Sequence, residues 1–360
     1  MTPLHLTSTA EGTGKTATTV ALARLARDRG QTPGYMKPKG TRLQSNVGKT
    51  LDADPMLARD LLDIEAEMHE LEPVVYSPTF VENAIRGRED PAALHERVRE
   101  AFEGLAADAD RMFVEGADAW TTGGIVDLTD RDVADLLDTR TVLVSRYDTE
   151  RDVDDVLAAA DAFGDRFGGV VFNAVSDAAI DVLEADVVPF LEGRGVPVHG
   201  VLPRDPGLAG VRVRDLAEEL GAEVLVEAGA DAFVERFQVG AMGAEEALRV
   251  LRRTSDAALV TGGDRSDVQT AALEAPGVNA LVLTGGVRPA DAVLGRAADA
   301  GVPVLLVQSE TLTTVERMGE VIDGGRIRDE TTVDRLQELL ADHADVDALL
   351  GDTGDDGTDT

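Results

Sequence analysis

The sequence contains no cysteine, and only four of its 34 basic residues are lysine. The absence of cysteine excludes disulfides, a thiolate nucleophile and Cys-ligated zinc or iron–sulfur sites. The five histidines are scattered, without the short spacings of a metal site. No apolar run reaches the length of a membrane span, and the N-terminus lacks the basic region of a signal peptide. We therefore expect a soluble, cytoplasmic protein with no membrane partner.

Positive charge is also scarce: the sequence has 34 basic and 68 acidic residues, which gives a net charge of −34. Such a chain repels nucleic acid, whose binding needs clustered lysine and arginine. The acidic residues are spread along the chain, and a surface of this kind stays hydrated in concentrated salt, where repulsion between charges is screened. We expect no nucleic-acid partner and a halophilic source. An acidic protein from an ordinary cytoplasm is the alternative.

At 360 residues, of which 43% are hydrophobic, the chain is long enough for two domains. Its first two-thirds alternates short apolar runs with helical patterns, which is typical of an α/β fold with a mostly parallel sheet flanked by helices. The expected strands are Leu4–Ser8, Met112–Val114, Thr141–Val144, Gly169–Phe172, Val196–Val201 and Glu223–Val226. The expected helices include Val153–Phe167 and Ala209–Leu220. Ligands of such sheets bind beyond the carboxyl ends of the strands.

A glycine-rich turn lies between the first expected strand and a helical pattern. Residues 9–16 read Thr-Ala-Glu-Gly-Thr-Gly-Lys-Thr, in the context that a phosphate-binding loop requires. Converging backbone N–H groups and a helix N-terminus would bind the phosphates of ATP. Lys15 would reach the β- and γ-phosphates, and the Thr16 hydroxyl would bind Mg²⁺. The expected nucleotide-binding residues of this loop are Glu11, Gly12, Thr13, Gly14, Lys15 and Thr16.

The loop departs from the usual pattern at Thr9, where a glycine normally stands five residues before Gly14. A tight strand–helix turn with an exposed lysine is therefore the alternative. All four lysines lie in the first fifty residues, although the chain otherwise uses arginine. Because a compact ammonium and a wide guanidinium are not interchangeable in a pocket, this clustering favours a functional site.

Polar residues that could bind a ligand follow two of the expected strands and one polar loop. Glu115 comes directly after Met112–Val114, where a second contact to Mg²⁺ would arise. Asp52 and Asp54 follow a polar loop, and either could bind the metal or a substrate. Asn173 ends another strand, and its amide could pair with a purine edge. The alternatives are solvated loop carboxylates and an Asx turn.

Four segments together resemble the dethiobiotin synthetase-like P-loop family, which includes the cobyrinic acid a,c-diamide synthase amidoligases. They are Thr9–Thr16, Gly34–Pro38, Phe113–Ala117 and Val171–Asn173. The resemblance covers about residues 1–226. It implies phosphate and Mg²⁺ roles for Lys15 and Thr16, and Mg²⁺ ligands at Glu115 and Asp54, less surely at Asp52. It also implies that Lys37 lies at the phosphate and carboxyl-transfer site and that Asn173 contacts adenine.

The remainder resembles a DRTGG domain, and its matching segments are Gln238–Met242, Ala258–Asp267, Leu281–Gly286 and Val304–Val307. The order of the two domains is that of the N-terminal half of long bacterial phosphate acetyltransferases. The implied division is a P-loop domain at 1–226, a smaller α/β DRTGG domain at 227–342 and an acidic, disordered tail at 343–360.

Two Thr-Gly-Gly turns in this second domain each follow an expected strand. Backbone N–H groups at such turns can bind an anion, and Arg265 could bind a carboxylate or phosphate. The candidate ligand residues are Gly262, Gly263, Asp264, Arg265, Gly285 and Gly286. Equally, glycines in sharp turns need no ligand, and Arg265 could form an ion pair with Asp264 or Asp267.

The sequence contains no acetyl-transfer domain after the DRTGG segment, so the resemblance does not imply phosphate acetyltransferase activity. It implies a regulatory or sensor protein that binds ATP and Mg²⁺, with weak ATPase activity left open. A small metabolite at the DRTGG domain and an acetate- or acetyl-CoA-metabolising enzyme are the expected partners, and fold analogy suggests a homo-oligomer. The alternatives are an ATP-dependent ligase of the dethiobiotin synthetase type and a non-catalytic scaffold with a relic P-loop.

Overall fold

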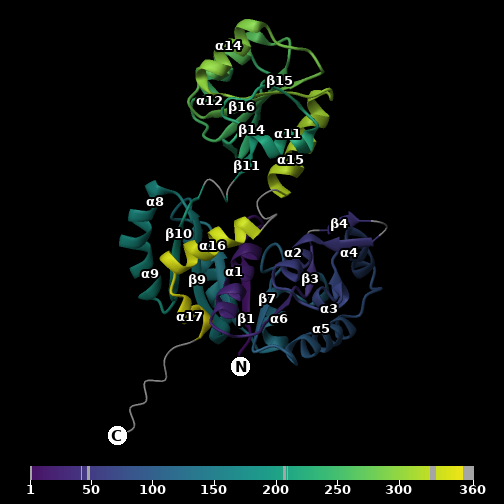
Figure 1. Cartoon of the computed structure of the whole chain (residues 1–360). Helices are drawn as coiled ribbons and strands as arrows, with labels where there is room; N and C mark the ends of the chain where they lie inside the picture. The colour runs from purple at the N-terminus through teal and green to yellow at the C-terminus, as the bar shows by residue number, and fades with distance from the viewer. Residues whose placement is uncertain are drawn as a thin grey trace. The chain divides into compact units, whose positions relative to one another are not determined.

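The computed structural model describes residues 2–41, 43–46, 49–205, 208, 210–324 and 330–351. The chain forms two compact units (Figure 1). Unit 1 comprises Met1–Arg204 and Asp329–Thr360, and unit 2 comprises Asp205–Arg328. Among the described residues, no helix is both long and apolar enough to cross a bilayer.

Unit 1 is built on a six-stranded sheet in the order β10-β9-β8-β1-β7-β2, in which every neighbouring pair is parallel. Its strands are β1 (Leu4–Ser8), β2 (Pro33–Met36), β7 (Arg111–Glu115), β8 (Arg140–Ser145), β9 (Phe167–Val175) and β10 (Val198–Pro203). The expected α/β fold with a mostly parallel sheet is confirmed. Because β1 lies between β7 and β8, the loop after β1 is flanked by the carboxyl ends of both neighbours.

Helices of unit 1 pack against this sheet, and sequence signals place several of them. The main ones are α1 (Lys15–Asp28), α5 (Pro91–Ala106), α6 (Asp130–Leu137) and α7 (Asp152–Phe163). Asp90 caps α5 ahead of a proline at its first position, and Thr129 forms a capping box at the start of α6. Apolar side chains of α5 and α6 pack on β7, and those of α7 pack on β8 and β9.

Short elements complete the first part of unit 1. They are β3 (Lys39–Gly40), β4 (Leu43–Asn46), β5 (Lys49–Asp52), α2 (Ala53–Leu61), α3 (Met68–Leu71), β6 (Val74–Val75), α4 (Pro78–Ile85), a 3₁₀ turn (Gly124–Val126), a second 3₁₀ turn (Gly164–Arg166), α8 (Asp177–Val182), a π-helical turn (Leu183–Val187) and α9 (Val188–Glu192). Of these, β4 and β5 form a hairpin that leads directly into α2.

Unit 2 has a five-stranded sheet in the order β12-β17-β16-β15-β14, with β12 antiparallel and the other pairs parallel. Its elements are β11 (Val211–Arg212), α11 (Val213–Leu220), β12 (Glu223–Val226), β13 (Phe233–Val234), β14 (Arg236–Val239), α12 (Ala244–Leu251), β15 (Ala257–Gly262), α13 (Ser266–Leu273), β16 (Val278–Thr284), α14 (Asp291–Ala300), β17 (Val304–Leu306) and α15 (Thr311–Gly324). One apolar cluster packs α11 and α15 on the sheet, and another packs α12, α13 and α14.

The structure corrects the expected domain boundaries. Glu223–Val226 was assigned to the first domain, but it is β12, which pairs with β17 in unit 2. At the other end, α16 (Glu330–His343) and α17 (Val346–Leu350) belong to unit 1, so the second unit ends before residue 342. The expected disordered tail therefore begins with helical residues as far as Leu350, and residues 352–360 lie outside the described part of the chain.

The returning helix α16 lies along α1, as Figure 1 shows in yellow against purple. Arg24 of α1 forms an ion pair of 2.9 Å with Asp334, and Arg29 forms one of 2.6 Å with Asp347 of α17. The apolar side chains of α16 are buried, including those of Leu336 and Leu340. This packing explains why the segment joins unit 1 although it follows unit 2 in the sequence.

Candidate functional site

The loop between β1 and α1 requires two left-handed residues. Gly12 has φ 69° and Gly14 has φ 87°, a region that glycine enters without strain. A Cβ atom at Gly14 would lie 2.2 Å from Nδ2 of Asn173, so a larger residue is also excluded by contact. Gly14 is the N-cap residue of α1 and has no side chain with which to cap the helix.

The backbone N–H groups of this loop fit an anion. Thr13 is buried, and within the described ranges the N–H groups of Thr13 and Gly14 donate to no protein acceptor. Buried N–H groups are nearly always paired, so the N–H of the buried Thr13 indicates a ligand, and the N–H of the half-buried Gly14 follows it in the loop. Together with the positive end of α1 they form the kind of concavity that binds phosphate.

Lys15, the first residue of α1, is buried beneath this loop. Its ammonium donates to the backbone oxygen of Ala117 and, at 3.3 Å, to Oγ of Ser8. Among the described residues, no carboxylate lies within ion-pair distance of its Nζ. Burial lowers the pKa of Lys15, and Glu115 opposes that shift. A buried cation with only neutral partners attracts an anion.

Glu115 ends β7 and accepts two hydrogen bonds in the interior. The hydroxyl of Thr16 donates to Oε1 at 2.6 Å, and the hydroxyl of Tyr35 donates to Oε2 at 2.7 Å. Burial raises the pKa of Glu115 to about 7, although Lys37 opposes the shift. Burial and the neighbouring Glu115 hold the pKa of Tyr35 well above its ordinary value.

Lys37, just after β2, is surrounded by carboxylates. Its Nζ lies 2.5 Å from Oδ2 of Asp54, 2.8 Å from Oδ2 of Asp52 and 3.9 Å from Oε1 of Glu115. Asp52 also caps α2 by accepting from the N–H of Asp54 at 2.8 Å. Burial lowers the pKa of Lys37, but Asp54, Glu115 and Asp52 together raise it above its ordinary value. The structure thus brings together Lys37, Asp54 and Glu115, three of the candidate site residues, and their roles stay predictions.

Glu72 contacts this cluster at Asp52, and one of its two carboxylate oxygens has no hydrogen-bond partner among the described residues. Its Oε2 accepts from the N–H of Asp52 at 3.0 Å, whereas its buried Oε1 has no partner. Burial raises the pKa of Glu72 to about 7. The folded chain therefore keeps a proton on Glu72 at pH values where the unfolded chain has lost it.

Glu72→Gln should stabilise the chain above neutral pH. Between about pH 4.5 and 7 the folded state binds more protons at residue 72 than the unfolded state does, so wild-type stability falls as pH rises through this window. A glutamine does not titrate, so the gain should grow from pH 5 to pH 7 and then level off. We expect a melting temperature higher by roughly 3 °C at pH 8, measured by thermal unfolding. Glu65→Gln, at an exposed carboxylate, is the control, and a constant difference across pH would contradict the prediction.

A second buried ion pair, which the sequence did not predict, fixes the loop after β7. Nζ of Lys39 lies 2.8 Å from Oδ1 of Asp130, and Oδ2 of Asp130 accepts from the hydroxyl of Thr7 at 2.6 Å. Oδ1 of Asp130 also accepts from the N–H of Ala117 at 3.2 Å. Burial would raise the pKa of Asp130, but Lys39, His5 and Lys15 lower it. Asp130 thus binds the backbone N–H of Ala117, the residue whose backbone oxygen accepts from Lys15.

Two side chains bind the outer side of the phosphate loop. Nδ2 of Asn173 donates to the oxygen of Thr13 at 2.8 Å. Arg146, directly after β8, donates to the oxygen of Gly12 from Nε at 3.1 Å and from Nη2 at 2.7 Å. The sequence predicts a contact of Asn173 with adenine, which stays a prediction, and it predicts neither of these two contacts with the loop. The position of Arg146 shortly after the expected strand Thr141–Val144 was the signal that could have indicated a contact with the loop.

The gathered oxygen atoms suit a hard cation such as Mg²⁺. Thr16 and Glu115 are joined directly, and Asp54 is linked to Glu115 through Lys37. In the described ranges, no group of three or more His, Cys, Asp or Glu residues is arranged to hold a metal. Mg²⁺ in phosphate loops keeps waters and phosphate oxygens as ligands, so a threonine and one or two carboxylates are sufficient from the protein.

In unit 2 the two Thr-Gly-Gly turns lie side by side at the carboxyl ends of β15 and β16. Gly263 donates to the oxygen of Thr284 at 3.4 Å, and a Cβ at Gly263 would lie 1.7 Å from the oxygen of Val287. Arg265 donates from Nη2 to the oxygen of Met242 at 2.8 Å, and its Nε lies 3.7 Å from Asp267. Close packing therefore accounts for Gly263, and backbone and ion-pair contacts account for Arg265. Ligand binding at the six candidate residues stays a prediction.

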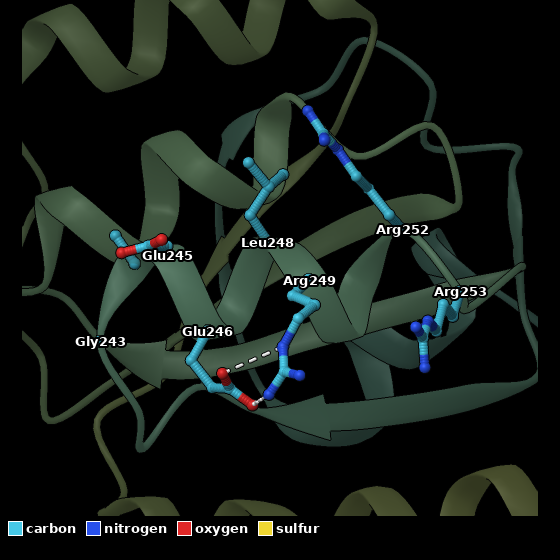
Figure 2. Close-up of a pocket in the computed structure, with 8 residues that line it drawn as sticks. Gly243, Glu245, Glu246, Leu248, Arg249, Arg252 and Arg253 are labelled. Atoms are coloured by element: carbon cyan, nitrogen blue, oxygen red, sulfur yellow. Dashed lines mark hydrogen bonds and ion pairs between the residues drawn. The ribbon is translucent and has the colours of Figure 1, made fainter.

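A hollow of about 850 Å³ lies along α12 of unit 2 (Figure 2). It is lined by Gly243, Ala244, Glu245, Glu246, Leu248, Arg249, Arg252 and Arg253. Nε of Arg249 donates to Oε2 of Glu246 at 3.1 Å, and Arg252 and Arg253 follow the last turn of the helix. Cations at a helix C-terminus interact favourably with its dipole, so these charges need no ligand to explain them.

The parallel sheet, the glycine loop between β1 and α1, the buried Lys15 and the Thr16–Glu115 pair define a P-loop NTPase-like protein. Residues 2–212 match the AAA domain family, which is more than half of the chain, and the chain belongs to that family. Residues 215–321 match the DRTGG domain. The predicted order of a P-loop domain followed by a DRTGG domain is confirmed.

Two curated relatives agree with this assignment. Phosphate acetyltransferase of Pseudomonas putida is 26% identical over 356 residues, which is 93% of this chain and 49% of that protein. The chain thus spans about half the length of this relative. ATP-dependent dethiobiotin synthetase BioD of Bacillus cereus is 24% identical over 206 residues, which is 56% of this chain and 84% of that protein. The resemblance to both families is confirmed.

Two solved structures are also similar to part of the chain. The cell division protein MinD of Aquifex aeolicus is 15% identical with a TM-score of 0.36, and the match covers 57% of this chain and 84% of MinD. The CBS and DRTGG domains of the regulatory region of Clostridium perfringens pyrophosphatase, solved with the activator diadenosine tetraphosphate, are 14% identical with a TM-score of 0.28. That match covers 42% of this chain and 80% of the solved chain.

Proposed function

We propose that unit 1 binds ATP with Mg²⁺ and that the chain is a regulatory or sensor protein related to the N-terminal part of phosphate acetyltransferases. The observation that carries the proposal is Lys15, a buried ammonium whose partners among the described residues are neutral, next to the N–H groups of Thr13 and Gly14, which donate to no acceptor in that part of the chain. This arrangement favours a bound polyphosphate over an empty loop.

Each residue has a distinct part in the proposed complex. The N–H groups of Thr13 and Gly14 bind phosphate oxygens, and Lys15 leaves Ala117 to contact the β- and γ-phosphates. Thr16, Glu115 and Asp54 hold Mg²⁺, which neutralises phosphate charge when bound. For Glu115 this requires a deprotonated carboxylate, so its raised pKa makes metal binding stronger above neutral pH.

The proposal extends to unit 2 and to partners. The turns at Gly262–Arg265 and Gly285–Gly286 are the candidate site for a small metabolite, whose binding would be sensed by the chain. An enzyme of acetate or acetyl-CoA metabolism is the proposed protein partner, and the chain is proposed to work in the cytoplasm as a homo-oligomer. The support is the similarity to phosphate acetyltransferase across 93% of the chain.

Titration calorimetry tests the nucleotide site. Purified protein is titrated with ATP–Mg²⁺, ADP–Mg²⁺ and ATP with chelator, in molar KCl because a net charge of −34 repels an anionic ligand at low salt. Binding of ATP that weakens when Mg²⁺ is removed supports the proposal. A folded protein that binds none of the three contradicts it and favours a scaffold with a relic loop. Release of ADP, followed in the same samples, reports whether the chain is an ATPase.

A ligase of the dethiobiotin synthetase type is the second candidate. It is favoured by Lys37, which lies in a buried cluster with Asp52, Asp54 and Glu115 beside the phosphate loop. Such a cation could stabilise charge during phosphoryl transfer to a carbamate. An assay with diaminopelargonic acid, CO₂ and ATP decides the matter, because absence of both ADP and product excludes this activity.

A further inference from the structure

We propose that Arg146 and Asn173 are positioning residues of the phosphate loop. By holding two consecutive carbonyl groups on its outer side, they turn the N–H groups of Thr13 and Gly14 toward the bound polyphosphate. This inference rests on the proposed binding of ATP and Mg²⁺ by the same loop. Arg146 and Asn173 are the side chains that give the loop its binding conformation.

The contacts come from two neighbouring strands. Arg146 follows β8 and donates twice to the oxygen of Gly12, at 3.1 and 2.7 Å. Asn173, near the end of β9, donates to the oxygen of Thr13 at 2.8 Å. Because β8 and β9 pair in parallel, both side chains reach the loop from the carboxyl edge of the sheet. The loop is thus fixed by groups outside its own sequence.

Peptide geometry links these contacts to the ligand. In a planar trans peptide, the C=O of one residue and the N–H of the next point in opposite directions. Arg146 holds the oxygen of Gly12, so the N–H of Thr13 points away from Arg146. Asn173 holds the oxygen of Thr13, so the N–H of Gly14 points away from Asn173. Neither of these two N–H groups donates to an acceptor within the described residues.

The loop needs such support because its glycines make it flexible. Gly12 and Gly14 adopt left-handed angles, and an unrestrained glycine loses more conformational entropy on ordering than any other residue. The chain also has Thr9 where phosphate loops usually have a further glycine. Side chains that hold the loop before the ligand arrives reduce the entropy lost on binding.

Arg146→Ala and Asn173→Ala test the inference, with Arg151→Ala as the control for loss of an exposed arginine nearby. Each variant is titrated in molar KCl with ATP–Mg²⁺, ADP–Mg²⁺ and inorganic tripolyphosphate with Mg²⁺. We expect both loop variants to weaken all three ligands by a similar factor, roughly tenfold, as for loss of one or two hydrogen bonds. Arg146 is exposed, so Arg146→Ala should melt within about 2 °C of wild type. Arg151→Ala should bind as wild type does.

Other outcomes overturn the inference in distinct ways. If Arg146→Ala weakens ATP and tripolyphosphate but not ADP, Arg146 contacts the γ-phosphate directly. If Asn173→Ala weakens both nucleotides but not tripolyphosphate, Asn173 contacts the base. Unchanged binding in both variants shows that the two contacts do not position the loop. A wild-type chain that binds none of the three ligands overturns the proposed function and this inference together.

Discussion

Lys15→Ala is expected to abolish measurable binding of ATP–Mg²⁺. Among the described residues the Lys15 ammonium donates to Ser8 and to the Ala117 backbone and forms no ion pair, so it can transfer to phosphate without breaking one. A hydrogen bond to a charged group contributes about 1.5–3 kcal/mol, and a phosphate-loop lysine makes more than one. The dissociation constant should therefore rise at least about 100-fold, measured by calorimetry in molar KCl.

The fold of Lys15→Ala should be preserved. The ammonium of Lys15 has no ion-pair partner among the described residues, so its removal also removes the free-energy cost of burying that charge. The melting temperature should therefore not fall by more than about 2 °C. Arg27→Ala is the matched control, since it also removes a cation from α1. Its 3.5 Å ion pair with Asp63 is exposed, so it should leave both stability and binding unchanged. Equal affinity of the Lys15→Ala variant and wild type would contradict the nucleotide site.

The sequence predicts those parts of the site whose residues lie close together in the chain or directly after a recognisable strand. Lys15 and Thr16 lie in a glycine-rich turn with a spacing typical of a phosphate loop, and Glu115 directly follows an apolar strand. A buried parallel strand is apolar on both faces, so β1, β7, β8 and β9 appear as continuous runs. The right-handed connections of such folds restrict the order of these strands in the sheet but do not fix it.

The parts that the sequence does not predict depend on long-range contacts. Lys39 and Asp130 meet across 91 residues, and Arg146 reaches Gly12 across 134. Neither pair differs in local pattern from the many exposed charges of this acidic chain. The helical pattern of α16 indicates an amphipathic helix, but not that its apolar face packs on α1. Boundaries drawn from sequence order alone therefore place β12 in the first domain and α16 in the second, whereas the structure has β12 in unit 2 and α16 in unit 1.

Lys37→Met should be the most destabilising single change in the site. It leaves the carboxylates of Asp52 and Asp54, now 2.8 and 2.5 Å from the ammonium, buried without their cation. Removal of one partner of a buried ion pair typically costs about 3–5 kcal/mol. We expect a loss of that order in the free energy of unfolding, measured by denaturant titration at pH 8. Arg86→Met is the control, because its exposed 3.2 Å pair with Glu82 contributes little.

The dependence on pH and on a second substitution identifies the cause of this loss. Without Lys37, the buried carboxyl groups hold protons that the unfolded chain has released, so the stability of the variant falls as pH rises. The deficit should therefore be larger at pH 8 than at pH 5. Asp54→Asn in the Lys37→Met background removes one of the uncompensated charges and should restore part of the stability, whereas in wild type it should destabilise. A deficit that is independent of pH and unaffected by Asp54→Asn would instead attribute the effect of Lys37 to packing of its aliphatic chain.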